Sequence, residues 1–253
     1  MNAPRTARIG RRLATALSSQ TWVLAVLNNG STVAGTDQRQ SDVDFTVIVR
    51  RAADRAKVLR LLRRRFPYRY LGLDHGVPSF SDRRKIGVTI IDRATVERWL
   101  RLLYRTPADF LELEGTVQHK IVEAVAIFDP QCLLERYQAK VAVFPRRIQR
   151  AVISRALESL EEAYENWGFR NEFQYVAQLT SLLENICIAL YARNRRLFMI
   201  PFKRLHADLA RLRPNIEAEM GRLVRGGKSV ESRSDGKRAL RSIIQKLRTG
   251  YQA

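Results

Sequence analysis

The residues best suited to chemistry lie between positions 30 and 45. Gly30-Ser31 is followed by Gly35, and then by Ser41-Asp42-Val43-Asp44-Phe45. Apolar residues alternate with other residues from Val43 to Val49, a pattern typical of a β-strand. Side chains on a strand alternate between its faces, so Asp42 and Asp44 point the same way with Cα atoms about 6.7 Å apart. Two carboxylates at this spacing can converge on one cation.

Paired carboxylates beside a glycine-serine turn are suited to phosphoryl transfer. Carboxylate oxygens favour Mg²⁺, which neutralises charge on a triphosphate and on an attacking hydroxyl. Glycine permits close approach of the backbone to phosphates, and serine and amide groups donate hydrogen bonds to phosphate oxygens. We therefore interpret Asp42 and Asp44 as catalytic metal ligands. We expect Gly30, Ser31 and Ser41 to contact a nucleotide.

The surrounding sequence predicts the elements that position this motif. Hydrophobic periodicity and turn residues predict helices at 4–19, at 52–66 and from 94, and strands at 22–27, 43–49, 68–73, 85–91 and 124–128. The turn residues at 74–78 indicate that the strands at 68–73 and 85–91 form an antiparallel hairpin.

The pattern changes after Pro145, where long helical stretches replace strands. Helices are predicted at 147–166, 171–193 and 202–212, followed by a glycine- and serine-containing linker at 226–236 and a basic helix around 237–247. The sequence therefore predicts two domains, at residues 1–145 and 146–253. A chain of 253 residues, 45% of them hydrophobic, can form two such cores.

The motif resembles the signature of the DNA polymerase beta-like nucleotidyltransferase superfamily, in which Gly-Ser and a second glycine precede Asp-x-Asp on the next strand. The matching residues are Gly30, Ser31, Gly35, Asp42 and Asp44. The resemblance implies an α+β fold, with a nucleotidyltransferase-type mixed sheet and flanking helices. It also implies an enzyme that uses Mg²⁺ to move a nucleoside monophosphate from a nucleoside triphosphate to a hydroxyl, releasing pyrophosphate.

The second half is similar to the helical domain of antibiotic nucleotidyltransferases, which implies an all-helical C-terminal domain that binds the acceptor. In some relatives a lysine after an aromatic-proline stretch approaches the triphosphate, and Lys203 follows Pro201-Phe202. This makes Lys203 a candidate nucleotide-binding residue. From the sequence alone, an ordinary basic residue at a helix start is the alternative.

The sequence departs from the family pattern at the third carboxylate. The family places an acid within a later strand, whereas this chain has Gly87 and Thr89 between apolar residues there. Asp92 follows that strand and precedes a helix, so it is expected to be an N-cap. Asp74 and Asp82 fall in the predicted hairpin. No general base is assigned.

Charge and cysteine content limit the partners and the compartment. The net charge of +20 favours a polyanion, so we expect an RNA acceptor such as tRNA, whereas a cationic aminoglycoside would be repelled. Cys132 and Cys187 have no paired spacing or histidine cluster, which argues against disulfides and zinc. No signal peptide and no stretch of about 18 apolar residues is found, so we expect a soluble, cytoplasmic protein.

Two other functions remain open. A small-molecule antibiotic nucleotidyltransferase of aminoglycoside or lincosamide type could bind a cationic acceptor through an acidic helical cluster at Glu158, Glu161, Glu162 and Glu165. An inactive nucleotidyltransferase fold could serve as a nucleotide- or nucleic-acid-binding module, and a solvated surface turn is the plainest alternative for the motif. We expect structural roles for the isolated histidines, and core or domain-interface positions for Trp167, Phe169, Phe173 and Tyr175.

Overall fold

The computed structural model describes residues 3–29, 43–65, 70–74, 77–81, 86–169, 171–197, 205–226 and 230–249. The chain divides into two compact units, Met1–Val143 and Phe144–Ala253. The predicted domain boundary, after Pro145, lies close to this division. Each unit has its own buried core, and each is described separately below.

The first unit is built on a six-stranded sheet with the order β3-β4-β5-β2-β1-β6. Its strands are β1 (Val23–Asn29), β2 (Val43–Val49), β3 (Tyr70–Asp74), β4 (Val77–Ser81), β5 (Ile86–Asp92) and β6 (Val125–Phe128). The β2–β5 pair is parallel, and the other neighbouring pairs are antiparallel. The sheet is therefore mixed, which confirms the predicted α+β class.

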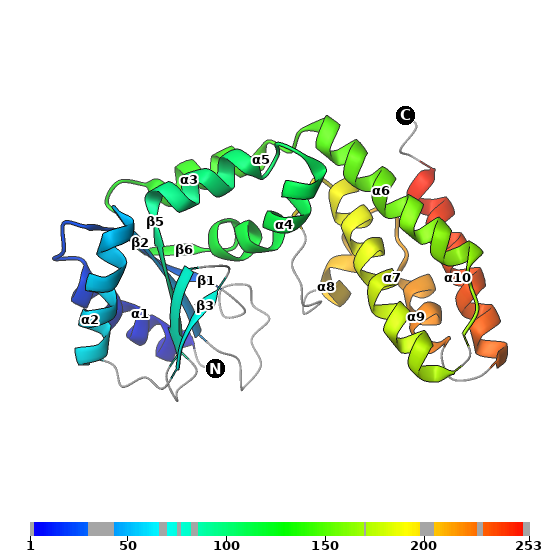
Figure 1. The fold of residues 1–253 in the computed structure, drawn as a ribbon, viewed down its shortest axis with the longest axis horizontal. Helices are drawn as coiled ribbons and strands as arrows, with labels where there is room; N and C mark the ends of the chain where they lie inside the picture. Colours follow the sequence, from blue (N-terminus) through cyan, green and yellow to red (C-terminus); the bar gives the residue numbers. More distant parts are fainter. Residues whose placement is uncertain are drawn as a thin grey trace. The chain divides into compact units, whose positions relative to one another are not determined.

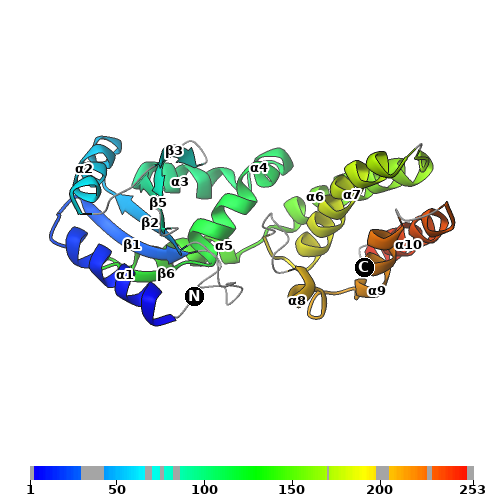
Figure 2. The ribbon, with the colours of Figure 1, turned by 90° about the horizontal axis from the view of Figure 1, so that it is seen from below.

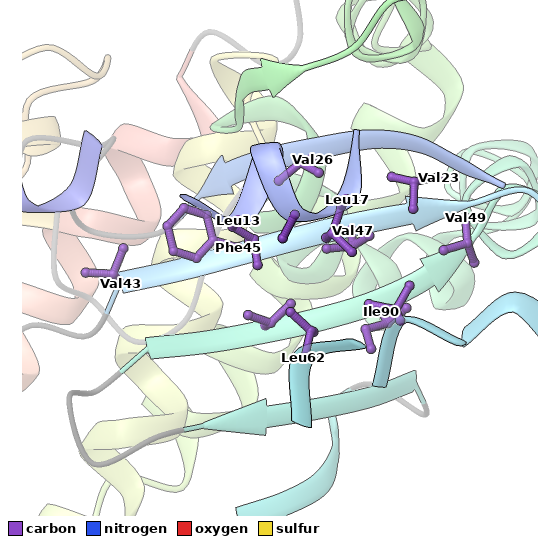
Figure 3. Close-up of a cluster of buried hydrophobic side chains, with 13 residues drawn as sticks. Leu13, Leu17, Val23, Val26, Val43, Phe45, Val47, Val49, Leu62 and Ile90 are labelled. Atoms are coloured by element: carbon purple, nitrogen blue, oxygen red, sulfur yellow. The ribbon is translucent and has the colours of Figure 1, made fainter. Parts of the chain in front are cut away.

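Two helices cover one face of this sheet (Figure 1). Helix α1 (Ala3–Leu17) contributes Leu13 and Leu17, and helix α2 (Arg55–Arg65), which follows the short helix η1 (Ala52–Asp54), contributes Val58 and Leu62. They pack on alternate residues of β2, as Figure 3 shows; these residues are Val43, Phe45, Val47 and Val49. Because alternate residues of a strand share a face, this apolar face forces the intervening residues of β2 to the opposite side.

The remaining elements of the first unit follow β5 and β6. They are α3 (Arg93–Leu102), α4 (Pro107–Val117), the π-helix η2 (Gln118–Val122) and α5 (Leu133–Ala142). Helix α3 starts where the Asp92 side chain accepts a hydrogen bond from the Thr95 amide, and α4 starts with a Thr106 cap and Pro107. Thus Asp92 is an N-cap, as predicted.

The described part of the second unit contains helices and no strands. Its helices are α6 (Arg146–Glu165), α7 (Glu172–Arg193), α8 (Leu205–Leu209), α9 (Glu217–Arg225) and α10 (Val230–Arg248). Helices α6 and α7 lie side by side, as Figures 1 and 2 both show. Trp167, Phe169 and Tyr175 meet edge to face, and Tyr175 is almost completely buried. The predicted core position is confirmed for Tyr175, whereas Trp167 and Phe169 are half-buried and Phe173, for which the same position was expected, is 82% exposed.

Helix α7 is, among the described residues, the one helix long and apolar enough to cross a membrane. Half of its apolar stretch is buried. The core helix of a soluble protein has the same length and composition, so this helix is weak evidence for a membrane span. The structure is compatible with the expected soluble protein.

Two sequence-based expectations are wrong. The strands β3 and β5 do not form a hairpin with each other, because β4 lies between them and pairs with both. Pro78 and two serines hid this strand, since these residues are uncommon in strand interiors. The stretch predicted as a linker up to Gly236 is also partly helical, because α10 already begins at Val230.

Candidate functional site

Asp44 lies at the end of the β1–β2 pair, on the face of the sheet opposite the apolar cluster. Its Cα partner on β1 is Asn29, the last residue of that strand, and its partner on β5 is Gly87. The Asp44 side chain is half-buried. The other predicted site residues, Gly30, Ser31, Ser41, Asp42 and Lys203, lie outside the described residues.

Gly87 leaves space for the Asp44 carboxylate. A Cβ atom added to Gly87 would lie 2.5 Å from Oδ1 of Asp44, closer than real Cβ atoms approach another atom. The carboxylate therefore lies against the backbone of β5, in the space that a side chain at position 87 would fill.

A chain of buried polar groups begins next to Asp44. Asn29 and Thr46 are fully buried, and Thr46 Oγ1 donates a hydrogen bond to Asn29 Oδ1 at 3.1 Å. The Asn29 amide nitrogen contacts His119 Nε2 of η2, also at 3.1 Å. An amide NH₂ can only donate, so in this orientation Nε2 accepts. His119 thus has the hydrogen-bonded structural contact that its isolation in the sequence led us to expect.

Lys120, the next residue of η2, reaches the neighbouring strand. Its ammonium group donates a hydrogen bond of 3.0 Å to Thr89 Oγ1, and both residues are at least 95% buried. The contacts of η2 therefore reach β1 and β5, the two strands on either side of β2. A buried ammonium group is costly unless it is hydrogen-bonded, so these contacts fix η2 against the polar face.

Neither of the other acids on the described strands lies beside Asp44. Asp92 lies at the opposite end of β5, about 16 Å along the strand from Gly87, and pairs with Arg55. Asp74 ends the edge strand β3, and Asp82 lies outside the described residues. No group of three His, Cys, Asp or Glu residues suited to a metal occurs in the described part of the chain.

The donor set at this site nevertheless fits Mg²⁺. Mg²⁺ is commonly bound through one or two carboxylates together with substrate phosphates, and does not require a cage of protein ligands. Asp44 supplies a hard carboxylate oxygen, and the missing side chain at Gly87 leaves that oxygen room beside β5.

The acidic cluster on α6 has neighbouring cations in the second unit. Glu158, Glu162 and Glu165 are exposed, while Glu161 is half-buried and forms an ion pair with Arg248 of α10. Lys237 of α10 lies over the Tyr164 ring, 4.9 Å from its centroid. The cluster therefore has the character of a solvated helix face that is partly neutralised by α10.

The cations of α10 are largely engaged within the second unit. Lys246 contacts Glu219, Arg238 contacts Asp235, and Arg248 contacts Glu161. The predicted basic helix thus has less charge available for a partner than its sequence suggests.

The outer surface of α1 and α2 has a different balance of charge. Within residues 10–29 and 43–64, the exposed charged side chains are all basic, because Asp54 is buried and Asp44 is half-buried. We call this set of exposed basic residues the arginine face. It comprises Arg11 and Arg12 of α1, Arg50 and Arg51 between β2 and η1, and Arg60, Arg63 and Arg64 of α2, together with Lys57, which is paired with Asp54.

The sequence did not identify Asn29, Thr46 or Lys120 as part of this site. Asn29 and Thr46 are polar residues inside apolar strands, and Lys120 precedes an apolar run. These polar interruptions were the available signal. Their meaning depends on the pairing of segments about 90 residues apart, such as Asn29 with His119.

No family model matches the chain, and no curated protein matches it in sequence. The chain is similar to the structure of a nucleotidyltransferase-like protein from Exiguobacterium sibiricum 255-15, with 12% identity, a TM-score of 0.42, and coverage of 97% of this chain and 78% of that chain. It is also similar to a spectinomycin adenyltransferase from Enterococcus faecialis, solved with ATP and spectinomycin. That protein has 16% identity and a TM-score of 0.37, with 100% coverage of both chains. Both TM-scores are low, so a function has to be inferred from the residues of the first unit.

Proposed function

We propose that this chain is a Mg²⁺-dependent nucleotidyltransferase that moves a nucleoside monophosphate from a nucleoside triphosphate to a hydroxyl group of RNA, such as a tRNA. The position of Asp44 carries this proposal. Asp44 is paired with Asn29, and Asn29 directly precedes Gly30-Ser31 in the chain. The β1–β2 pair therefore ends where the glycine-serine segment begins and where the Asp-x-Asp motif enters its strand.

The roles of the residues follow from their chemistry. Asp42 and Asp44 would hold Mg²⁺, and Gly30, Ser31, Ser41 and Lys203 would contact the triphosphate. When bound, Mg²⁺ would neutralise negative charge on the triphosphate. In the transfer, a bond forms between the acceptor oxygen and the α-phosphorus while the hydroxyl proton passes to water, the bond from the α-phosphorus to the bridging oxygen breaks, and pyrophosphate leaves.

The buried groups around Asp44 keep this end of the sheet rigid. Thr46, Asn29 and His119 are connected by hydrogen bonds, and Lys120 holds Thr89. A catalytic carboxylate has to stay within about 0.5 Å of its productive position, so such support is useful to the reaction. We assign positioning roles, and not catalytic roles, to these groups.

The arginine face supports RNA as the acceptor. Arginines neutralise phosphates and draw a polyanion to the surface, whereas they repel a polycationic antibiotic. We propose that the first unit performs the transfer and contributes the arginine face, and that the helical second unit binds the acceptor. A cytoplasmic location agrees with the two free cysteines, of which Cys187 is buried and has its pKa raised to about 12 by that burial and by Glu184.

Labelling with each of the four radioactive nucleoside triphosphates tests the reaction. The protein is incubated with Mg²⁺ and total RNA, and in parallel with spectinomycin. We expect one RNA species to be labelled by the wild type and by neither Asp42→Asn nor Asp44→Asn. Labelling of spectinomycin in place of RNA would establish the small-molecule activity instead. Triphosphate binding without transfer to either acceptor would indicate a binding module.

The salt dependence of RNA binding tests the arginine face. Replacing Arg60, Arg63 and Arg64 of α2 by glutamine should lower the slope of log affinity against log salt by about 2, because each lost phosphate contact contributes about 0.7. A matched variant, with Arg238, Arg241 and Arg248 of α10 replaced by glutamine, has the same net charge as the α2 variant. An equal loss of slope in both variants would mean that only total charge matters, and would contradict a role for the arginine face.

A further inference from the structure

We propose that Gly87 is a positioning residue, whose missing side chain sets the direction of the Asp44 carboxylate. This inference rests on the proposed function, since it concerns the carboxylate that would hold Mg²⁺. Asp44 and Gly87 are direct Cα partners in the parallel β2–β5 pair. The Asp44 Oδ1 atom lies 2.5 Å from where a Cβ at position 87 would be. The carboxylate and a side chain at position 87 therefore require the same space.

The surrounding structure prevents the strands from separating to accommodate both groups. The β2–β5 pairing continues without interruption from Val43 and Ile86 to Val49 and Asp92. On the apolar face, the residues next to Asp44 and Gly87 are Phe45 and Val88, which are at least 99% buried. The chain can therefore adjust most easily by rotating the Asp44 side chain.

The polar face is fixed in the same region. Two residues further along each strand, Thr46 donates to Asn29, and Thr89 accepts from the buried Lys120. A shift of β5 away from β2 would disturb these hydrogen bonds, and a buried polar group that loses its partner is costly. The movable atom next to position 87 is therefore the carboxylate oxygen of Asp44.

The required movement is large on the scale of a metal site. Real Cβ atoms essentially never lie closer than 3.0 Å to such a neighbour, so Oδ1 would have to move by about 0.5 Å or more. Functional groups have to be held within about 0.5 Å of their productive geometry. A single added methyl group should therefore weaken metal binding without removing any ligand.

The same geometry connects Gly87 to the missing third carboxylate. An aspartate or glutamate at position 87 would begin with a Cβ in the space that Asp44 already occupies. With Asp44 in this position, β5 cannot place an acid directly beside it. The direction of the Asp44 carboxylate thus requires glycine at position 87. The carboxylates that would hold the metal then come from the Asp-x-Asp strand and not from β5.

The test compares Gly87→Ala with Gly10→Ala in the full-length protein. Gly10 lies on α1 in the same unit, and its added Cβ would meet Ile127 Cδ1 at 2.6 Å, a similar overlap without a carboxylate. Mn²⁺ affinity is measured by electron paramagnetic resonance, with the α,β-methylene analogue of ATP present. We expect Gly87→Ala to weaken Mn²⁺ binding by about tenfold or more, and Gly10→Ala to leave it unchanged.

A double-mutant cycle supplies a second readout that does not depend on metal binding. Gly87→Ala should lower the midpoint of urea unfolding in the wild type, but much less in an Asp44→Ala background, where the overlapping carboxylate is gone. Equal shifts in both backgrounds, or wild-type Mn²⁺ affinity in folded Gly87→Ala, would overturn the proposal. If the wild type binds no Mn²⁺ with the analogue while the cycle still shows coupling, the proposed function fails and the packing of Asp44 on Gly87 stands.

Discussion

The two faces of β2 are built from alternate residues of one strand, and they differ in chemistry over the part of the strand that contains Asp44 and Thr46. Val43, Phe45, Val47 and Val49 belong to the apolar cluster under α1 and α2. Asp44 and Thr46 lie on the opposite face, next to the buried contacts of η2. The apolar face has the close packing that stabilises the unit, and the polar face has groups whose directions are fixed. Neighbouring residues of one strand should therefore differ in what their substitution damages.

The largest effect is expected on the polar face. Asp44→Asn removes a metal-binding charge but keeps the side-chain volume, so the rate of nucleotide transfer should fall about a thousandfold, which corresponds to about 4 kcal/mol. The free energy of unfolding should change by less than about 0.5 kcal/mol. Initial rates at saturating triphosphate and Mg²⁺, together with urea unfolding, measure both quantities. A variant that keeps wild-type turnover would show that Asp44 is not a metal ligand.

A smaller effect, on stability and not on the transfer rate, is expected at Val47 of the same strand. Val47 is fully buried, and Val47→Ala removes two methyl groups from the cluster under α1 and α2. The free energy of unfolding should fall by about 2 kcal/mol, because apolar burial is lost and a cavity remains. The transfer rate should stay within about twofold at a temperature where the variant is folded. A large loss of rate in the folded variant would mean that packing on the apolar face affects the position of Asp44 on the other face.

The smallest effect is expected at Asp92, a carboxylate with a structural role, in contrast to the metal-binding role proposed for Asp44. Burial raises the pKa of Asp92, but hydrogen bonds from Thr95 and the contact with Arg55 outweigh it and bring the pKa below the ordinary 3.8. A lowered folded-state pKa means that the carboxylate stabilises the fold above its unfolded-state pKa and loses this effect as the pH falls through the folded-state value.

Asp92→Asn should therefore lower the free energy of unfolding at pH 7 by about 1 kcal/mol, since asparagine still caps α3 but loses the charge interaction with Arg55. The difference from the wild type should shrink as the pH falls below about 4 and the wild-type carboxylate becomes protonated. Urea unfolding from pH 7 to pH 2 measures this convergence. A difference that stays constant with pH would contradict the charge interaction.

The elements around the motif could be predicted because their patterns are local. The alternation from Val43 to Val49 identified β2, and the capping chemistry of Asp92 identified the start of α3. Strand β4 was missed because Pro78 argues locally against a strand. The pairing with β3 and β5, which no local pattern shows, forms the strand despite the proline. Ser79 is the first residue of β4 that pairs with β5, so the proline lies just beyond that ladder.

Gly236 shows why the linker prediction failed. A glycine in a serine-rich stretch usually indicates a loop, yet this glycine lies inside α10. A Cβ there would meet Tyr175 Oη at 3.1 Å and Trp167 Cζ2 at 3.2 Å. The glycine permits close packing of α10 on the aromatic cluster, a requirement that depends on residues about 60 positions away.

The candidate site was only partly accessible from the sequence for the same reason. The Asp-x-Asp spacing is local, so Asp44 could be proposed directly. The contact of Asp44 with the space over Gly87 depends on the parallel register of β2 and β5, which no local pattern specifies. The sequence indicated that β5 lacks the third acid of the family pattern. The register of β2 and β5 shows that the Asp44 carboxylate lies in the space that a side chain at position 87 would fill.

The pairing of β6 with β1 has a consequence for how the first unit folds. Val26 pairs with Phe128, so the two strands are joined across a loop of about a hundred residues. Closing such a loop is entropically costly, and folds dominated by distant contacts form slowly. During synthesis, β1 has to wait for β6 with one edge unpaired, whereas the neighbouring helices α6 and α7 can associate as soon as both have emerged. A chain that stops before Val125 would keep that edge of β1 exposed, and exposed edges promote association with other chains.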